Sequence, residues 1–328
     1  MAGYKRTEMV RKVHHSGEEL LLPVATIQGD REGPTFAITA GMHAGEYAGI
    51  LAAIRLIQDL QPQRLAGRVI IVPVISTRAF MMRYMQLSPV DEKEVHHQVP
   101  GNPNGTYSEF LVDELYQVLH GANYLIDMHA GEFAQTLLSW VVVPMLGDLE
   151  MKRMAHRLAQ GFEVQYLDLR TDAEKVPNLC RFLADQGIVN IYAEVGKNGL
   201  PDPKDVAVQY NGCLNALRAV GMLPGEQPQV FQHQYLGQTH HTVVAKQSGI
   251  WYPAVTLGQV VRRGDLLGEL RDYFGNLVER YQSPMDGIVL YYWSSPAINA
   301  QRRPHGYDWH AGLVRLAGLP TPEPNVQL

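Results

Sequence analysis

The first two-thirds of the chain alternate between short runs of apolar, often β-branched residues and longer amphipathic stretches. The apolar runs cover residues 35–40, 68–75, 124–128, 138–143 and 188–193. The stretches with helical periodicity cover residues 46–60, 107–120, 148–160, 178–186 and 203–220. Strands that alternate with helices of these lengths predict an α/β domain, with a mostly parallel or mixed sheet and helices on both faces.

The pattern changes after residue 223. Residues 224–229 contain two prolines and a glycine, which interrupt any helix, so a linker is predicted there. Beyond residue 230 only short apolar runs remain, for example at 287–292, and glycines and prolines separate them. This pattern is typical of a small all-β domain. We therefore predict an α/β domain over residues 1–223 and a β-rich domain over residues 230–328.

Composition and charge narrow the function classes. Hydrophobic residues make up 46% of the chain, but no run approaches the roughly 20 apolar residues that cross a bilayer. A net charge of −5 gives no electrostatic signature of binding to nucleic acid or to a membrane surface. The N-terminus is polar and lacks the apolar core of a signal peptide. Only Cys180 and Cys213 are present, so a cytoplasmic protein without disulfides is predicted.

The segment 40–49 is the first that carries candidate chemistry. It follows a predicted strand and opens a predicted helix, which is where ligands bind in open α/β sheets. His43 and Glu46 are three residues apart, so on a tight turn both side chains can reach one point. An imidazole and a carboxylate are a suitable start for a zinc site with three protein ligands. The alternative is a polar loop histidine beside a glutamate that complements the helix N-terminus.

Two further predicted strands end in polar residues. Asp127 and His129 are two residues apart, so both project from the same face of their strand. His129 is suited to be a third metal ligand, and Asp127 to accept the N–H of a ligand imidazole. Glu194 follows the strand at 188–193, where it is suited to act as a general base and then as an acid towards a leaving amine. Each residue alone is equally explained as a polar residue at the end of a strand. Three separate strands that each end in acidic or imidazole side chains, however, favour a catalytic site.

These segments together resemble the succinylglutamate desuccinylase and aspartoacylase family, which is related to the zinc carboxypeptidases. The resemblance extends over essentially the whole chain and rests on three motifs in order: His43-Ala44-Gly45-Glu46, Asp127-Met128-His129 and Glu194-Val195-Gly196. It implies a zinc carboxypeptidase-like fold and one Zn²⁺ per chain. It further implies that His43, Glu46 and His129 hold the zinc ion and that Glu194 is the general acid/base.

Four more residues are compared with the family pattern. Arg83, followed by a tyrosine, looks like the family arginine that polarises the scissile carbonyl. His96 and His97 stand where family enzymes acting on acidic amino acids carry an Asn-Arg pair that binds the substrate carboxylate. His96 and His97 are predicted to contact the substrate, and two interpretations stay open: a protonated His97 still binds an anion, or the substrate is not an acidic amino acid. Arg181 loosely resembles a substrate-binding arginine of the family.

The C-terminal region has a resemblance of its own, to the biotinyl/lipoyl-type β hammerhead. It rests on the segments 258–268 and 283–289, which lack the modifiable lysine of a true carrier. A structural cap or an oligomer contact is therefore favoured over a carrier role. The remaining histidines are assigned to surface or core positions: His14, His15, His120, His156, His233, His240, His241, His305 and His310.

The sequence thus predicts a zinc-dependent amidohydrolase that removes the acyl group from a small N-acyl amino acid or a related compound. The expected partner is this small molecule, and neither nucleic acid nor membrane is expected. An exposed strand edge in the β-rich domain offers a surface for a homo-oligomer. Two alternatives stay open: a zinc carboxypeptidase-like peptidase, and a non-catalytic protein that binds a metal or a ligand.

Overall fold

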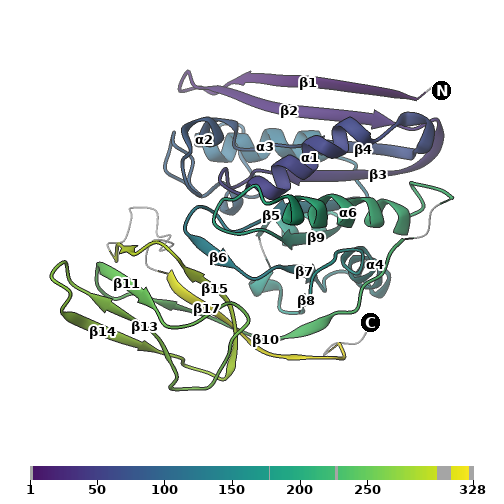
Figure 1. Ribbon diagram of the computed structural model, residues 1–328. Helices are drawn as coiled ribbons and strands as arrows, with labels where there is room; N and C mark the ends of the chain where they lie inside the picture. Colours follow the sequence, from purple (N-terminus) through teal and green to yellow (C-terminus); the bar gives the residue numbers. More distant parts are fainter. Residues whose placement is uncertain (1–2, 177, 226–227, 301–311, 325–328) are drawn as a thin grey trace.

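The computed structural model describes residues 3–176, 178–225, 228–300 and 312–324 (Figure 1). The α-helices are α1 (Tyr47–Asp59), α2 (Thr77–Met82), α3 (Tyr107–Leu119), α4 (Leu149–Ala159), α5 (Asn178–Asp185) and α6 (Pro203–Ala219). The 3₁₀ helices are η1 (Pro62–Arg64), η2 (Val95–His97) and η3 (Ala173–Lys175). The strands that precede α6 are β1 (Tyr4–Val13), β2 (Glu19–Gln28), β3 (Arg31–Ala40), β4 (Ala66–Val72), β5 (Tyr124–His129), β6 (Gln135–Leu137), β7 (Trp140–Pro144), β8 (Tyr166–Arg170) and β9 (Val189–Glu194). The later strands are β10 (Gln234–Val244), β11 (Gly249–Pro253), β12 (Val260–Val261), β13 (Leu266–Arg271), β14 (Leu277–Gln282), β15 (Gly287–Trp293), β16 (Ala297–Ile298) and β17 (Gly312–Thr321).

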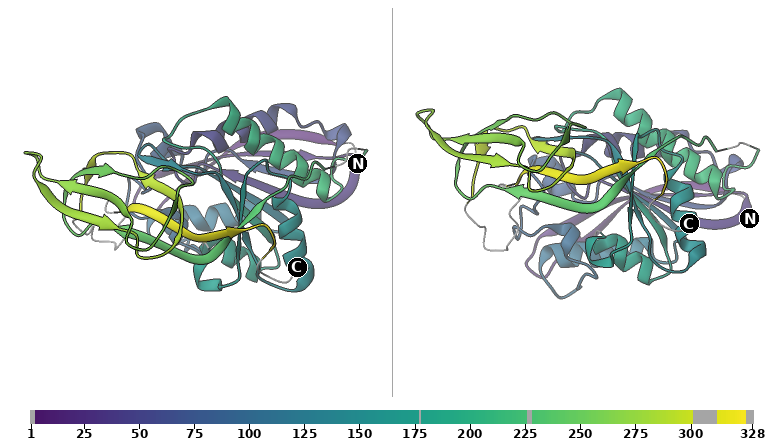
Figure 2. Two further views of the ribbon diagram at one scale, coloured as in Figure 1. Left: turned by 60° about the horizontal axis from the view of Figure 1, so that its bottom comes forward. Right: turned by 90° about the horizontal axis from the view of Figure 1, so that it is seen from below.

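Most strands belong to one mixed sheet that runs through the molecule (Figure 1). Its order is β1-β2-β4-β3-β5-β9-β7-β8-β10-β17-β15-β12, and β6 pairs with β15. The strands β4, β3, β5 and β9 are parallel neighbours, whereas β7 runs antiparallel to β9. Parallel strands need crossover connections, and helices cover the sheet on both sides, as Figure 2 shows. The predicted mixed α/β fold is confirmed.

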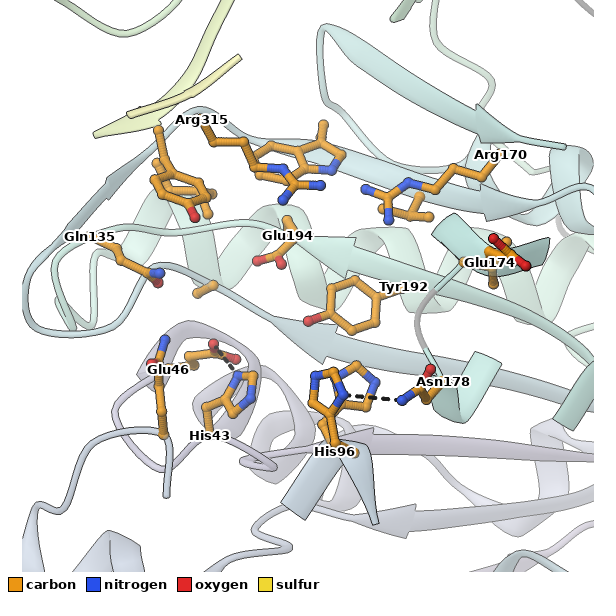
Figure 3. A pocket seen from close by; sticks show the side chains of 18 residues that line it. His43, Glu46, His96, Gln135, Arg170, Glu174, Asn178, Tyr192, Glu194 and Arg315 are labelled. Carbon is orange, nitrogen blue, oxygen red and sulfur yellow. Dashed lines mark hydrogen bonds and ion pairs between the residues drawn. The ribbon is translucent and has the colours of Figure 1, made fainter. Parts of the chain in front are cut away.

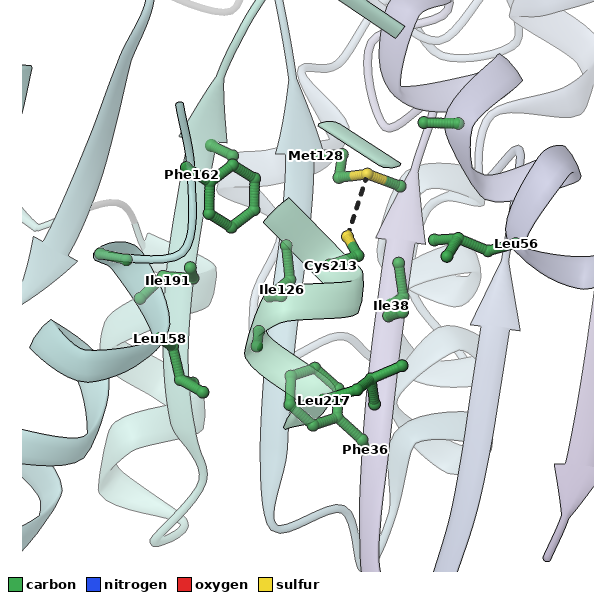
Figure 4. Close-up of a cluster of buried hydrophobic side chains, with 14 of the residues drawn as sticks. Phe36, Ile38, Leu56, Ile126, Met128, Leu158, Phe162, Ile191, Cys213 and Leu217 are labelled. Atoms are coloured by element: carbon green, nitrogen blue, oxygen red, sulfur yellow. Dashed lines mark hydrogen bonds between the residues drawn. The ribbon is translucent and has the colours of Figure 1, made fainter. Parts of the chain in front are cut away.

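The two faces of the central strands pack against different helices. In β3, Phe36 and Ile38 lie in a cluster with residues of α1, α4 and α6, while Ala37 lies in a second cluster with residues of α3 and α5. Successive strand residues point to opposite faces, which explains this division. Leu56 of α1 and Leu217 of α6 are fully buried in the first cluster (Figure 4). Burial of one such side chain contributes about 2 kcal/mol, so both helices hold the central strands firmly.

The five predicted helices and five predicted strands are all present, with shifts of a few residues at their ends. The strands β1, β2, β6 and β8 are additional. β1 is exposed along nearly its whole length and pairs with β2 as an antiparallel edge hairpin. A strand without a buried face shows no hydrophobic alternation, so its sequence carries no strand signal. The five residues of β8 are too short a run for a clear period.

The C-terminal strands continue the main sheet. β10 pairs in parallel with β8, and β15 pairs with β6, so residues after 228 extend the sheet of the α/β region. Four other strands form a separate sheet in the order β14-β13-β11-β16. Among the described residues beyond 228 there are strands but no helix, as the sequence predicts. The hammerhead type and the division into domains at 224–229 stay predictions.

Two smaller points concern the chemistry of the chain. Cys180 and Cys213 are both free and buried, which agrees with the expected lack of a disulfide. No helix in the described residues is long and apolar enough to cross a membrane. His305 and His310 lie outside the described residues.

Candidate active site

The polar residues at the strand ends meet at one edge of the sheet. β3, β5 and β9 are parallel neighbours, so their carboxyl ends lie together. In this register Ala40 is level with Met128, and His129 is level with Glu194. The loop that carries His43 and Glu46 follows β3 directly. Sheet pairing therefore brings the three sequence segments to one place, and Figure 3 shows His43, Glu46 and Glu194 of the first and third segments at one cavity.

Three side chains converge closely enough to hold a metal ion. His43 Nδ1 lies 2.8 Å from Glu46 Oε1, and His129 Nδ1 lies 2.8 Å from Glu46 Oε2. The two Nδ1 atoms are 3.3 Å apart. One ligand atom from each of the three residues lies within 4.8 Å of the others. All three residues are buried, with exposed fractions of at most 4%.

Two buried carboxylates orient the imidazole rings. His129 Nε2 lies 2.9 Å from Asp127 Oδ2, and Thr39 donates a hydrogen bond of 2.7 Å to Asp127 Oδ1. His43 Nε2 lies 2.9 Å from Glu94 Oε1. Each ring therefore donates its Nε2–H outward in the neutral form, which leaves a lone pair on Nδ1. Both lone pairs point towards the Glu46 carboxylate, and these three groups of electron donors fit a divalent cation between them.

The charges of the site also fit the binding of a divalent cation. Burial by itself would lower the pKa of His129, but the carboxylates of Asp127 and Glu46 raise it to about 10. Burial would likewise raise the pKa of Glu94, but His43 lowers it to about 2. Three ionised carboxylates thus surround two buried rings. Such a cluster attracts positive charge, which either two protons or one metal dication can supply.

Glu94 is a site residue that the sequence does not reveal. It lies in the charged run Asp91-Glu92-Lys93-Glu94, which reads as a solvated turn. In the structure it is 4% exposed and accepts a hydrogen bond from the backbone N–H of His96 at the start of η2. With His43 and His96 it forms a second group of potential metal ligands. The 2.9 Å contact between Glu94 and His43 fits two roles equally well: Glu94 as a metal ligand, or Glu94 as the group that orients the His43 ring.

Glu194 stands beside the proposed ligands. It ends β9, is half-buried and lines a cavity of about 260 Å³ together with His43 and Glu46. Burial and the nearby negative charge of Glu46 raise the pKa of Glu194 to about 7. Its Oε2 atom has no hydrogen-bond partner among the described residues. A carboxylate with a pKa near neutrality can both take up and release a proton.

The structure separates the three predicted substrate-binding residues and the predicted catalytic Arg83 into two pairs. His96 and His97 line the cavity. Arg83 and Arg181 do not line it: Arg83 is exposed and caps the C-terminal end of α2 with φ 52°, and Arg181 is half-buried on α5. Arg83, predicted to polarise the scissile carbonyl, thus lies outside the set of residues that line the cavity. Gln86, three residues further on, lines the cavity instead.

The path of the loop explains why Gln86 reaches the cavity. Gln86 is 6% exposed and has φ 54°. Its backbone N–H donates to Glu132 Oε1 at 3.2 Å, and the N–H of Gly45 donates to the same oxygen at 3.1 Å. The buried Glu132 thus joins the loop of His43 and Glu46 to the loop of Gln86. Gln86 adopts a left-handed backbone conformation and is held by a carboxylate that is distant in the chain. Neither feature leaves a pattern in the sequence.

Two arginines at the cavity are also absent from the sequence prediction. Arg170 comes from β8 and Arg315 from β17, and both line the cavity. No motif marks either residue, since β8 lacks a clear strand pattern and β17 lies about 120 residues beyond Glu194 in the chain. Of the scattered histidines, His240 contacts the buried Asp168 at 3.2 Å and His156 contacts Tyr235, as expected for structural positions.

Solved structures share this fold along nearly the whole chain. A succinylglutamate desuccinylase/aspartoacylase from Rhodobacter sphaeroides has a TM-score of 0.79 and 22% identity, covering 96% of this chain and 95% of that one. The product-bound ectoine utilization protein EutE (DoeB) from Ruegeria pomeroyi has a TM-score of 0.82 and 21% identity, covering 98% and 96%. The fold is therefore the mixed α/β fold of these proteins.

Sequence comparison identifies the family. The succinylglutamate desuccinylase/aspartoacylase catalytic domain matches residues 32–220. The chain belongs to this family, as the three motifs predict. A relative from Halomonas elongata, N-alpha-acetyl-L-2,4-diaminobutyric acid deacetylase, is 27% identical over 278 residues, which cover 82% of this chain and 80% of the relative.

Proposed function

We propose that this protein is a zinc-dependent hydrolase that cleaves the amide bond of a small N-acyl amino acid. The observation that carries the proposal is the convergence of His43, Glu46 and His129, since His43 and Glu46 line one cavity together with Glu194. Membership of the desuccinylase and aspartoacylase family supports the reaction class. The deacetylase name of the Halomonas elongata relative supports an N-acyl amino acid as the substrate.

Zinc is the metal that this donor set favours. Two imidazole nitrogens and one carboxylate are the protein ligands of many catalytic zinc sites, which keep a further position open. When held by His43, Glu46 and His129, the zinc ion supplies the Lewis acidity that polarises an acyl carbonyl and acidifies a water molecule. Asp127 and Glu94 keep the two rings in the tautomer that binds.

Glu194 transfers the proton in this proposal. Glu194 lines the cavity, its Oε2 atom has no hydrogen-bond partner among the described residues, and its raised pKa suits uptake of a proton from water and delivery to the leaving amine. His96 and His97 are proposed to contact the substrate from the opposite wall, since both line the cavity. Arg83 and Arg181 receive no role, because neither lines it.

The test is an assay of released amine with zinc-loaded protein. The panel contains N-acetyl and N-succinyl amino acids, including Nα-acetyl-L-2,4-diaminobutyrate, and dipeptides that report carboxypeptidase activity. We expect hydrolysis of at least one N-acyl amino acid, loss of activity on chelation, and its return with zinc. Cleavage of dipeptides alone would favour the carboxypeptidase alternative.

Matched variants separate metal binding from chemistry. Glu194→Gln should keep bound zinc and lose most of its turnover, by about 10² to 10⁴-fold. His43→Ala should lose the zinc ion as well, whereas His120→Ala, which changes an exposed histidine, should keep both zinc and activity. Full activity of the metal-free protein, or absence of any bound transition metal by elemental analysis, would overturn the proposal.

A further inference from the structure

A second group of charged side chains faces the cavity from the wall opposite His43 and His96. In Figure 3 the guanidinium groups of Arg170 and Arg315 extend from two strands towards the middle of the cavity, with Glu194 between this wall and the histidines. Arg170 ends β8, and Arg315 lies in β17. The two strands are separated in the sheet only by β10, so their side chains reach the same space.

Each arginine is held by a contact that leaves its end directed at the cavity. Arg170 donates from Nε to Asp168 Oδ2 at 2.8 Å, and Asp168 is completely buried. Arg315 donates from Nη1 to the Thr242 hydroxyl at 3.2 Å. Both side chains are thereby oriented before any ligand binds, which lowers the entropy that binding must overcome.

Arg315 lines the same cavity as the carboxylate of Glu194, but these two residues form no ion pair. Among the described residues Arg315 forms a hydrogen bond with the neutral Thr242 but no ion pair. Apolar side chains, including Trp140 and Val142, line the same cavity. A half-buried guanidinium in such surroundings favours an anion from outside. Glu174 also lines the cavity, but it is exposed to solvent, which screens its charge.

We propose that Arg315 and Arg170 form an anion-binding subsite that holds the carboxylate of the N-acyl amino acid. The inference rests on the proposed function and names the part of the substrate that this wall recognises. A carboxylate on the two arginines directs the amide bond towards Glu194 and the ligand cluster. The subsite would replace the permanent positive charge that is missing at His96 and His97, where imidazoles stand.

The position of Arg315 also gives the C-terminal strands a role in the substrate site. β17 pairs with β10 and β15, and β10 in turn pairs with β8. The strands after residue 228 therefore deliver a charged side chain to the catalytic cavity. In this proposal the C-terminal region completes the substrate site rather than only covering it.

The experiment compares a carboxylate ligand with its neutral analogue. Nα-acetyl-L-2,4-diaminobutyrate and its α-carboxamide are titrated calorimetrically into zinc-loaded Glu194→Gln protein, in which turnover is suppressed. We expect the carboxylate to bind more tightly in this background. Adding Arg315→Gln should weaken binding of the carboxylate by about 10- to 100-fold and leave the carboxamide nearly unchanged. Arg315→Lys should restore part of the preference, because it keeps the charge but not the two-pronged geometry.

Controls keep the result interpretable. Arg181→Gln removes an arginine that does not line the cavity, so it should not alter the preference. Zinc content and melting temperature identify a variant that fails to fold. If Arg315→Gln fails to fold, Arg170→Lys is the second test, and it should also reduce the preference for the carboxylate over the carboxamide. An equal carboxylate preference with and without Arg315 would overturn the subsite. If no N-acyl compound is hydrolysed by the wild-type protein, the proposed function fails, yet the binding comparison still decides the subsite.

Discussion

His129 Nε2 lies 2.9 Å from Asp127 Oδ2, and the two residues project from the same face of β5. A strand places alternate residues side by side, so this contact follows from their spacing of two. It fixes which nitrogen of His129 faces Glu46. The proposed metal ligand His129 is thus oriented by a carboxylate that lies within the same six-residue strand.

Removal of this contact should weaken metal binding without unfolding the protein. For Asp127→Asn we expect a loss of zinc affinity of about 10- to 100-fold, because the amide neither carries the charge nor fixes the ring equally well. Competition with a chromogenic chelator measures the affinity. Thr39→Val, which removes the hydrogen bond to Asp127 Oδ1 and a longer one to the Ile126 carbonyl, should have a smaller effect. An unchanged affinity in Asp127→Asn would contradict the orienting role.

Glu94 should act in the same way on His43. We expect Glu94→Ala to lower zinc affinity by about 10-fold or more, since His43 Nε2 loses the carboxylate at 2.9 Å. Glu92→Gln is the matched control, because Glu92 is exposed in the same loop. The same chelator competition applies. If zinc binding in Glu94→Ala equals that of Glu92→Gln, Glu94 does not orient the ring.

The rate of hydrolysis should rise with pH across the acidic range. Burial and the charge of Glu46 raise the pKa of Glu194 to about 7, and only its ionised form accepts a proton from water. A bound cation would stabilise the ionised form, so the midpoint of kcat/KM against pH should lie at or below about 7. In Glu194→Gln the residual rate should lose this acidic limb. An identical limb in the variant would assign it to another group.

Asp168 should stabilise the fold at neutral pH and not in acid. Burial opposes its ionisation, but Arg170 and His240 lower its pKa from the ordinary 3.8 to about 2. The stabilisation is therefore complete above about pH 4 and is lost as the pH falls towards 2, amounting to about 2 kcal/mol. Urea unfolding at pH 7 and at pH 3 measures the difference. Asp168→Asn should be less stable at pH 7, whereas the exposed control Asp185→Asn should not.

The sequence by itself determined the mixed α/β fold and the place of the proposed ligands. Each of His43, His129 and Glu194 directly follows or ends an apolar strand, and parallel strands present these ends at one edge. Glu46 is within one turn of His43. These relationships are local, so a linear pattern is enough to predict them.

Only the tertiary structure decided which side chains complete the cavity. Arg83 is three residues from Gln86, yet of these two only Gln86 lines the cavity, and its backbone N–H donates to the distant Glu132. Glu94 looks like a solvated charge until η2 folds it against His43. Arg315 reaches the site through the pairing of β17 with β10, far along the chain. Loop paths and long-range strand pairing depend on contacts between distant residues, and no local period records them.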